Sequence, residues 1–303
     1  MEEVIKPAPV RRKQAADFAP ELLELFDGYV HGVLTKREFL NRAARFAGGA
    51  AGAAAAFAAL KPNYALASQV SPDDPDIKTQ RVTYASPDGH GEVSGLMAMP
   101  TSGGPFGAVL VVHENRGLNP YIEDVVRRVA KAGYLALGPD GLSSLGGYPG
   151  NDDDGRTMQR SLDRGKLLND FFAGYEFLVG HDASTGKAGC VGFCYGGGVC
   201  NALAVAYEDL ACAVPYYGRQ AAVDDVPSIN AALLLQYAEN DARVNAGWPA
   251  YEAALKEHGK NYMAYVYDDA SHGFHNDTTP RYDAEAANLS WDRTLMWFEK
   301  YLR

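Results

Sequence analysis

Short apolar segments alternate with amphipathic segments of helical period from residue 77 to the end of the chain. The first two strands flank Pro87-Asp88-Gly89, a turn signal that indicates an antiparallel hairpin at a sheet edge. Continuously apolar strands separated by helices are typical of a mostly parallel sheet with helices on both faces, so the predicted fold class is α/β. We expect strands at 79–85, 92–99, 108–112, 134–137, 188–193, 211–215, 232–236 and 262–267, and helices at 120–132, 158–179, 196–207, 247–258 and 282–301.

The N-terminal 75 residues differ in composition from this alternating region. Residues 42–60 are almost entirely Ala, Gly and Phe, but the stretch is too short and too weakly apolar for a stable membrane span. Residues 35–41 resemble a twin-arginine export signal in which Lys36 stands at the first arginine, and residues 65–67 form a small-x-small cleavage site. This pattern predicts a periplasmic protein. If the segment is retained, the expected location is cytoplasmic.

A second interpretation of the same region is a helical appendage with an apolar stripe that packs on the body or on a second subunit, which would give a homo-oligomer. Residues 71–75 read as a linker, so we expect an appendage over 1–75 and a catalytic domain over 76–303. Both interpretations remain open at this point. The stripe consists of Leu22, Leu23, Leu25, Phe26 and Tyr29.

Charge and motif content exclude several classes of function. The net charge of −10 argues against a nucleic-acid-binding protein, which would present a basic face. The sequence has no Rossmann or P-loop glycine pattern, so we expect no nucleotide cofactor. His113 and His275 have no third ligand assigned to them, and residues 151–155 lack the distal Glu of a calcium loop and read as a solvated acidic loop. We therefore expect no metal.

Gly192-Phe193-Cys194-Tyr195-Gly196 is the most informative segment. It follows a buried strand and opens a helix rich in small residues, which is the nucleophile-elbow pattern with Cys in place of the commoner Ser. The unpaired N–H groups and the dipole of the helix N-terminus favour a thiolate at Cys194. The remaining cysteines lack this context and are expected to be core residues. They are Cys190, Cys200 and Cys212.

The order of reactive residues along the chain supports this interpretation. Asp241 follows an apolar strand downstream of Cys194, and His272 follows the next strand. Nucleophile, acid and then His is the order of α/β-hydrolases, and all three residues are expected at the carboxyl ends of the strands, where open α/β sheets bind ligands. The sequence therefore predicts a Cys194–His272–Asp241 triad.

These motifs resemble those of the dienelactone hydrolase (carboxymethylenebutenolidase) family over roughly residues 80–303. The resemblance rests on Gly-Phe-Cys-Tyr-Gly-Gly, on Asp241 and on His-Gly-Phe, and it implies an α/β-hydrolase fold. It also implies that Glu114, after the strand preceding the first large helix, helps to convert the resting Cys194 thiol to a thiolate. The backbone N–H groups of Tyr195 and Asn115 would form the oxyanion hole.

The chain departs from the family at the substrate carboxylate. An arginine stands four residues after the catalytic His in that family, and here the position is Asn276. An amide cannot replace a bidentate guanidinium, so Arg116 or Arg156 would have to compensate, and dienelactone is an unexpected substrate. The residues predicted to bind substrate are Arg116, Tyr148, Trp248 and Asn276. Tyr148 and Trp248, together with Tyr195, Tyr216 and Tyr217, are candidates for an aromatic pocket that suits a less polar acyl group.

The predicted function is cofactor-free hydrolysis of a small-molecule ester or lactone through a thioester acyl-enzyme. Two alternatives remain open. One is a thioesterase or peptidase activity on the same fold, which the fold alone cannot distinguish. The other is a non-catalytic oligomeric binding protein in which Cys194 is inert.

Overall fold

A computed structural model describes residues 13–66 and 68–303 of the chain. The chain divides into two compact units. The first runs to Asn63 and includes Thr279–Tyr282, and the second comprises Tyr64–Thr278 and Asp283–Arg303. The division at Asn63 precedes the predicted boundary at residue 75, which stays a prediction. Residues 1–12 of the predicted appendage and Ala67 of the predicted cleavage site lie outside the described residues.

The second unit is built on one sheet, in which the described residues form eight strands. The strand order is β1-β2-β4-β3-β5-β6-β7-β8, and the antiparallel β1–β2 hairpin lies at one edge as predicted. β2 is also antiparallel to β4, and β3 to β8 are mutually parallel. The strands are β1 (Ile77–Ser86), β2 (Gly91–Pro100), β3 (Phe106–Val112), β4 (Leu135–Pro139), β5 (Ser184–Phe193), β6 (Cys212–Tyr216), β7 (Ala232–Asn240) and β8 (Tyr262–Ser271).

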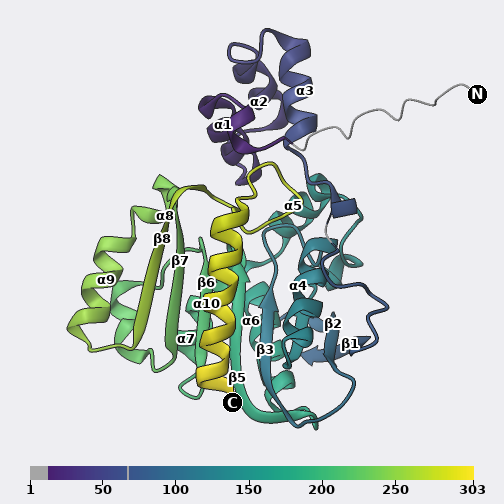
Figure 1. Ribbon diagram of the computed structural model, residues 1–303, viewed down its shortest axis with the longest axis vertical. Helices are drawn as coiled ribbons and strands as arrows, with labels where there is room; N and C mark the ends of the chain where they lie inside the picture. Colours follow the sequence, from purple (N-terminus) through teal and green to yellow (C-terminus); the bar gives the residue numbers. More distant parts are fainter. Residues whose placement is uncertain (1–12, 67) are drawn as a thin grey trace, which may run out of the picture. The chain divides into compact units, whose positions relative to one another are not determined.

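Helices cover both faces of this sheet (Figure 1). Side chains from α4 (Pro120–Lys131) and α10 (Ala284–Leu302) fill the hydrophobic core on one face. Side chains from α6 (Arg164–Val179), α7 (Tyr195–Ala206) and α9 (Trp248–Glu257) fill the core on the other. Because both faces are buried, the central strands carry uninterrupted apolar residues, which is the pattern that predicted a parallel sheet. Short 3-10 turns lie at Ala15–Asp17, Tyr64–Leu66, Ser143–Leu145 and Val223–Ser228.

The predicted helix over 158–179 is wrong, because two helices occupy the region. The first, α5 (Asp152–Ser161), begins earlier than predicted and ends before Leu162, whose backbone is extended. Asp163 then caps α6 by accepting a hydrogen bond from the Lys166 N–H at 2.9 Å. An N-cap side chain starts a helix at a fixed residue, so the apolar periodicity through this region belongs to two helices rather than one. A further short helix, α8 (Ala242–Asn245), was not predicted.

The first unit has a hydrophobic core of its own. It contains α1 (Pro20–Val30), α2 (Lys36–Ala43) and α3 (Ala50–Leu60). The apolar stripe predicted for this region lies on α1 and contributes to this core. Rings from all three helices meet there, with Phe39 and Phe57 centroids 5.3 Å apart. A homo-oligomer through this unit stays a prediction.

The export-signal-like segment over residues 35–41 forms the start of α2. Thr35 is the N-cap: its side chain accepts a hydrogen bond from the Glu38 N–H at 3.2 Å, and Glu38 in turn accepts from the Thr35 N–H at 2.7 Å. This reciprocal pair is a capping box, a strong helix-start signal. The export interpretation of the same residues stays a prediction. Among the described residues, no helix is both long and apolar enough to cross a membrane.

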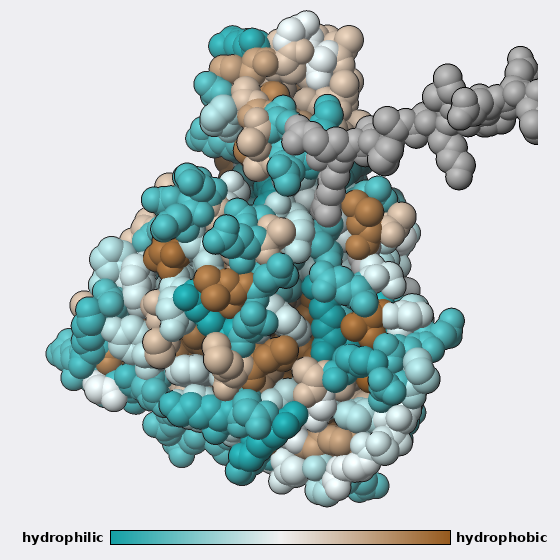
Figure 2. Space-filling model, in the orientation of Figure 1, coloured by the Kyte–Doolittle hydropathy of each residue, from teal (hydrophilic) through white to brown (hydrophobic). Residues whose placement is uncertain are grey.

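The surface visible in Figure 2 is mainly hydrophilic, with small separate apolar patches. Exposed large apolar side chains include Val33 on the first unit and Met296 on the second, at 73% and 63% exposure. Isolated residues of this kind are ordinary on soluble folds and mark no site by themselves.

The core of the first unit supplies a stability prediction. Phe39 is fully buried among the rings of the other two helices. Replacing it with Ala should lower the free energy of unfolding of this unit by about 3–5 kcal/mol, enough to unfold a domain of this size. Hydrogen exchange of the α1–α3 amides would measure the loss. Val33→Ala is the control, because its side chain is exposed; equal protection in the two variants would contradict the assignment.

Candidate active site

The parallel register of β7 and β8 brings Asp241 and His272 together. Asn240 at the end of β7 pairs with Ser271 at the end of β8. Asp241 and His272, which directly follow these paired residues, therefore lie side by side at the carboxyl ends of the two strands. Functional side chains of open α/β sheets gather at this edge. The Asp241 Oδ2 and the His272 Nδ1 lie 2.6 Å apart.

Asp241 is held in place by its position at the start of α8. Its Oδ1 accepts a hydrogen bond from the Val244 N–H at 3.3 Å, which leaves Oδ2 for the imidazole. A carboxylate fixed in this way orients the ring and requires Nδ1 to carry its proton. The Nε2 atom of His272 is then the one that can exchange a proton with a nucleophile.

Cys194 occupies a strained turn between β5 and α7. Its backbone has φ 56° and ψ −110°, a conformation that residues other than glycine rarely adopt. Its backbone N–H donates a hydrogen bond to the Tyr216 carbonyl oxygen at 3.1 Å. A Cβ atom at Gly192 would lie 2.2 Å from the Gly196 carbonyl oxygen, and one at Gly196 would lie 2.3 Å from that of Val112. Only glycine fits at these two positions, which accounts for the elbow pattern in the sequence.

The thiol and the imidazole are close enough to act as a pair. The Cys194 sulfur lies within 4.8 Å of a His272 ring nitrogen, and both side chains are buried. Burial opposes a positive charge on His272, but the charge of an ionised Cys194 and the hydrogen bond with Asp241 outweigh it and raise the pKa of His272 to about 10. A buried thiolate–imidazolium pair is the form of a cysteine that attacks carbonyl carbons.

Glu114 is buried in the loop after β3 and is held by two partners. Its Oε2 forms an ion pair with the Arg116 Nη2 at 2.9 Å and accepts from the Asn276 Nδ2 at 3.1 Å. The side-chain oxygen Oδ1 of Asn276 accepts a hydrogen bond from the Thr278 hydroxyl at 2.6 Å. Asn276 and Arg116, both predicted to bind substrate, therefore orient Glu114.

Asp152 completes the polar network behind Glu114. It pairs with the Arg116 Nη1 at 2.7 Å and accepts hydrogen bonds from the hydroxyl groups of Tyr64 at 2.5 Å and Tyr148 at 3.0 Å. The prediction that residues 151–155 form a solvated acidic loop is wrong for this residue. The segment forms the first turn of α5, which packs on the loop after β3 and buries Asp152.

The two histidines considered as metal ligands serve the structure instead. The His113 Nε2 accepts from the Gly141 N–H at 3.0 Å, so its Nδ1–H donates to the Glu114 carbonyl at 2.5 Å. The His275 Nδ1 lies 2.7 Å from the Tyr121 hydroxyl. Burial lowers the pKa of both histidines, so both rings are neutral at pH 7.

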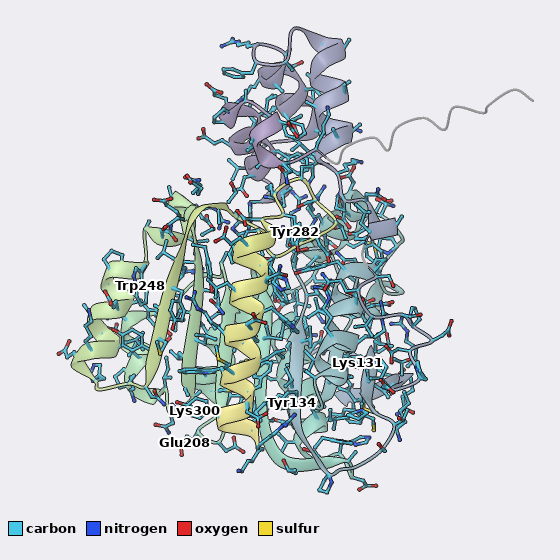
Figure 3. All side chains as sticks on the ribbon, viewed as in Figure 1. Lys131, Tyr134, Glu208, Trp248, Tyr282 and Lys300 are labelled. Carbon is cyan, nitrogen blue, oxygen red and sulfur yellow. The ribbon has the colours of Figure 1, made fainter. Side chains whose placement is uncertain are left out.

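The remaining predicted site residues fall into two groups. Tyr195 begins α7 directly after Cys194, and Asn115 lies in the loop after β3, the strand paired with β5. The two residues thus lie just after the carboxyl ends of neighbouring strands, and their role as an oxyanion hole stays a prediction. Trp248 begins α9 and packs against Tyr237, with ring centroids 5.1 Å apart (Figure 3). It belongs to the core on that face of the sheet.

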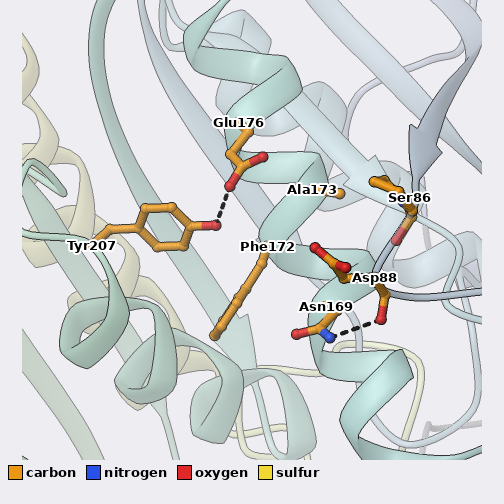
Figure 4. A pocket seen from close by; sticks show the side chains of 8 residues that line it. Ser86, Asp88, Asn169, Phe172, Ala173, Glu176 and Tyr207 are labelled. Atoms are coloured by element: carbon orange, nitrogen blue, oxygen red, sulfur yellow. Dashed lines mark hydrogen bonds between the residues drawn. The ribbon is translucent and has the colours of Figure 1, made fainter.

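A surface hollow elsewhere on the second unit contains none of these residues (Figure 4). It lies between the β1–β2 turn, α6 and the residue after α7. The Tyr207 hydroxyl donates to Glu176 at 2.8 Å, and the Asn169 amide donates to the Asp88 carbonyl at 2.8 Å. Cys190, Cys200 and Cys212 are likewise unrelated to the site, because they are buried in the core as predicted.

Two residues of the site were missed as site residues by sequence reasoning. Asp152 and Tyr64 reach the site only through the packing of segments distant in sequence, and no local pattern marks them. Tyr217, a sequence-predicted candidate for the aromatic pocket, follows β6 with a left-handed backbone (φ 35°) and lies with its ring centroid 5.0 Å from that of His272.

Comparisons with known proteins find several similar sequences. Residues 93–302 match the dienelactone hydrolase family model, and residues 10–48 match a YqhI-like model. A protein of Escherichia coli strain K12 described as a hydrolase fragment, YghX, is 65% identical over 112 residues, which are 37% of this chain and 96% of that protein. A protein of Methylorubrum extorquens described as a carboxymethylenebutenolidase is 31% identical over 70% of this chain and 78% of its own length.

Solved structures give the same fold. A crystal structure from Klebsiella pneumoniae, described as that of a dienelactone hydrolase, superposes with a TM-score of 0.64 at 26% identity. It covers 74% of this chain and all of that one. The mixed sheet with helices on both faces is thus the α/β-hydrolase fold predicted from the sequence.

The charge on His272 supplies a pH prediction. Because its pKa is raised to about 10, the imidazolium is present at neutral pH and is lost only as pH rises through about 10. Alkylation of Cys194 by iodoacetamide should therefore vary little between pH 7 and 9. In His272→Gln the rate at pH 7 should fall about tenfold or more and rise with pH, as for an unassisted thiol.

Mass spectrometry of the alkylated peptide would assign the site. Cys194→Ala gives the background, since burial raises the pKa of Cys190 and Cys212 and leaves them unreactive. Equal rates and equal pH profiles in wild type and His272→Gln would show that the imidazole does not support the thiolate.

Proposed function

Because the chain belongs to the dienelactone hydrolase family, and is thereby a hydrolase of the ester- and lactone-cleaving class, we propose that it acts through Cys194 as nucleophile. His272 serves as general base and acid, and Asp241 orients it. The observation that carries this proposal is the 2.6 Å contact between His272 and Asp241 with the Cys194 sulfur within 4.8 Å of the same ring. Nucleophile, base and orienting acid are the three parts that acyl transfer requires.

In the first step the Cys194 thiolate attacks the carbonyl carbon of an ester or lactone. The carbonyl π electrons move to oxygen, and the backbone N–H groups of Tyr195 and Asn115 bind the oxyanion. Donors of this kind contribute about 3 kcal/mol each to transition-state binding. The intermediate collapses with loss of the alkoxide, which takes a proton from the His272 imidazolium, and a thioester remains on Cys194.

In the second step His272, now neutral, removes a proton from water, which attacks the thioester carbon. The second tetrahedral intermediate expels the Cys194 thiolate, and His272 is again protonated. A lactone gives a single hydroxy acid, whereas an ester gives an acid and an alcohol. The proton that His272 gives to the leaving alkoxide is replaced by one from water, so hydrolysis consumes one water molecule and regenerates the starting enzyme without a cofactor.

Glu114 assists the resting enzyme in this proposal. It is a buried carboxylate in the loop beside the nucleophile turn, with one oxygen directed by Arg116 and Asn276. Such a group can take the proton of a Cys194 thiol when the site is empty, which supports the thiolate role that the family resemblance implies.

The alternative activities differ in the acyl group rather than in the machinery. A thioesterase or peptidase would use the same three side chains, so only a panel of substrates separates these activities from ester and lactone hydrolysis. The strained backbone of Cys194 and its pairing with a buried imidazole argue against an inert cysteine, because strain of this kind is retained where function requires it.

A substrate panel tests the proposal. Wild type should hydrolyse at least one of a set of lactones and aryl esters at neutral pH. Cys194→Ala should lower kcat/KM by on the order of a thousandfold, because it removes the group that forms the acyl-enzyme. Cys212→Ala is the matched control, since this cysteine is buried in β6, and it should retain activity. Activity unaffected by Cys194→Ala would refute the assignment.

A further inference from the structure

We propose that Asp152 makes the active site selective for uncharged acyl groups, by cancelling the positive charge of Arg116. The inference rests on the proposed hydrolase function and adds the substrate class to it. Asp152 would then be a residue that determines specificity, rather than a catalytic residue.

The first step of the argument is the pairing of Arg116. The guanidinium is 2% exposed and lies between two carboxylates, with Glu114 at 2.9 Å on Nη2 and Asp152 at 2.7 Å on Nη1. One cation between two anions leaves this buried cluster with a formal charge of −1. Because both terminal nitrogens already bind carboxylates of the protein, the fork that they form is not open to a substrate carboxylate.

Asp152 is ionised in this setting. Burial opposes its charge, but Arg116 and the hydrogen bond from Tyr64 outweigh the burial and lower the pKa of Asp152. Burial and the neighbouring Asp152 raise the pKa of Tyr64 far above its usual range, so the Tyr64 hydroxyl keeps its proton and donates it. The Tyr148 hydroxyl donates to the same oxygen at 3.0 Å.

The cluster lies beside the nucleophile. A Cβ atom at Gly196, two residues after Cys194, would be 2.8 Å from the His113 carbonyl oxygen, and Glu114 is the next residue of that loop. On the other side, a Cβ at Gly155 would be 2.4 Å from the Arg116 carbonyl, so α5 is packed directly on the loop. The charges of this cluster are screened weakly by salt, because they are buried in a water-poor region.

The other buried arginines of the second unit do not replace Arg116, as far as the described residues show. Arg128 pairs with Asp124 at 2.6 Å and with Asp277 at 2.7 Å. Arg127 pairs with Asp124, and Arg156 pairs with Asp153. A substrate carboxylate would therefore enter a site whose nearest fixed charges sum to a negative value, whereas a neutral acyl chain would meet no such opposition.

Two aryl esters of equal length test this inference. The substrates are p-nitrophenyl butyrate and mono-p-nitrophenyl succinate, whose acyl chains differ in a terminal methyl or carboxylate. Wild type should favour the butyrate in kcat/KM by about tenfold or more, and Asp152→Asn should reduce this ratio about fivefold or more. A fivefold change is the size expected for one unit charge about 17 Å away at an effective dielectric of about 20, and a closer charge gives a larger change. The asparagine retains the shape and can still hydrogen-bond the two tyrosines.

The ratio of the two kcat/KM values is the readout, because a structural defect would slow both esters alike. Asp154→Asn is the matched control: it removes one charge from the same helix turn at an exposed position and should leave the ratio within about twofold of wild type. Asp152→Ser gives a second charge-removing variant should the asparagine variant fail to fold.

Three results decide the matter. If wild type hydrolyses the two esters with kcat/KM values within about twofold of each other, the proposed selectivity is overturned, because a nearby charge should have a larger effect. The hydrolase function would remain intact. Equal shifts in Asp152→Asn and Asp154→Asn would show that only the overall charge of the protein matters, which also overturns it. If Cys194→Ala hydrolyses both esters as wild type does, the proposed function fails instead, and the inference with it.

Discussion

The site depends on a close approach between the start of α7 and the carboxyl end of β3. Gly196 lies where a Cβ atom would overlap the Val112 carbonyl oxygen, and Gly192 lies where one would overlap the carbonyl of Gly196. This contact places the N-terminus of α7 under Cys194 and sets the loop bearing Glu114 beside it. The N-terminus of α7, Cys194 and the loop that carries Glu114 can approach one another only because neither glycine has a side chain.

The parts of the fold that follow from local pattern could be predicted from sequence. The buried strands were found because they are continuously apolar, and Asp241 and His272 were found because each follows a strand directly. The parallel register of β7 and β8 then pairs Asn240 with Ser271, and this pairing brings Asp241 and His272 together. Cys194 was found because the glycines around it reflect a steric requirement that leaves few alternatives.

The parts that depend on packing between distant segments could not be predicted. Asp152 sits in an acidic run that looks solvated, and its burial results from the way α5 packs on the loop after β3. Arg116 and Asn276 were expected to face a ligand, yet each has a carboxylate of the protein as its partner. Charge alone does not tell whether a residue serves a substrate or a neighbour. The break between α5 and α6 was missed because apolar periodicity continues across it.

The loop after β3, which bears Glu114 and Arg116, has to meet two opposed requirements. In the proposed mechanism Glu114 must be held rigidly to exchange a proton with a thiol, which favours a nearby cation, and that cation would also attract anionic ligands. Asp152, the second carboxylate on Arg116, separates these effects. The guanidinium still pairs with Glu114, but Asp152 neutralises the positive charge that would attract an anionic ligand. A buried ion cluster of this type is costly to assemble and contributes little net stability, so its value lies in the electrostatics it creates.

The short segment Thr279–Tyr282 ties the loop after β8 to the first unit. Arg281 is buried there, with its Nη1 3.3 Å from Asp27 and its guanidinium 5.7 Å from the centre of the Phe26 ring. The helical unit is thus assembled from both ends of the chain rather than appended to one end. Loss of α1 would take Asp27 and Phe26 away from Arg281, so the segment at Thr279–Tyr282 and the N-terminal helices form one packing unit although more than 200 residues separate them in the sequence.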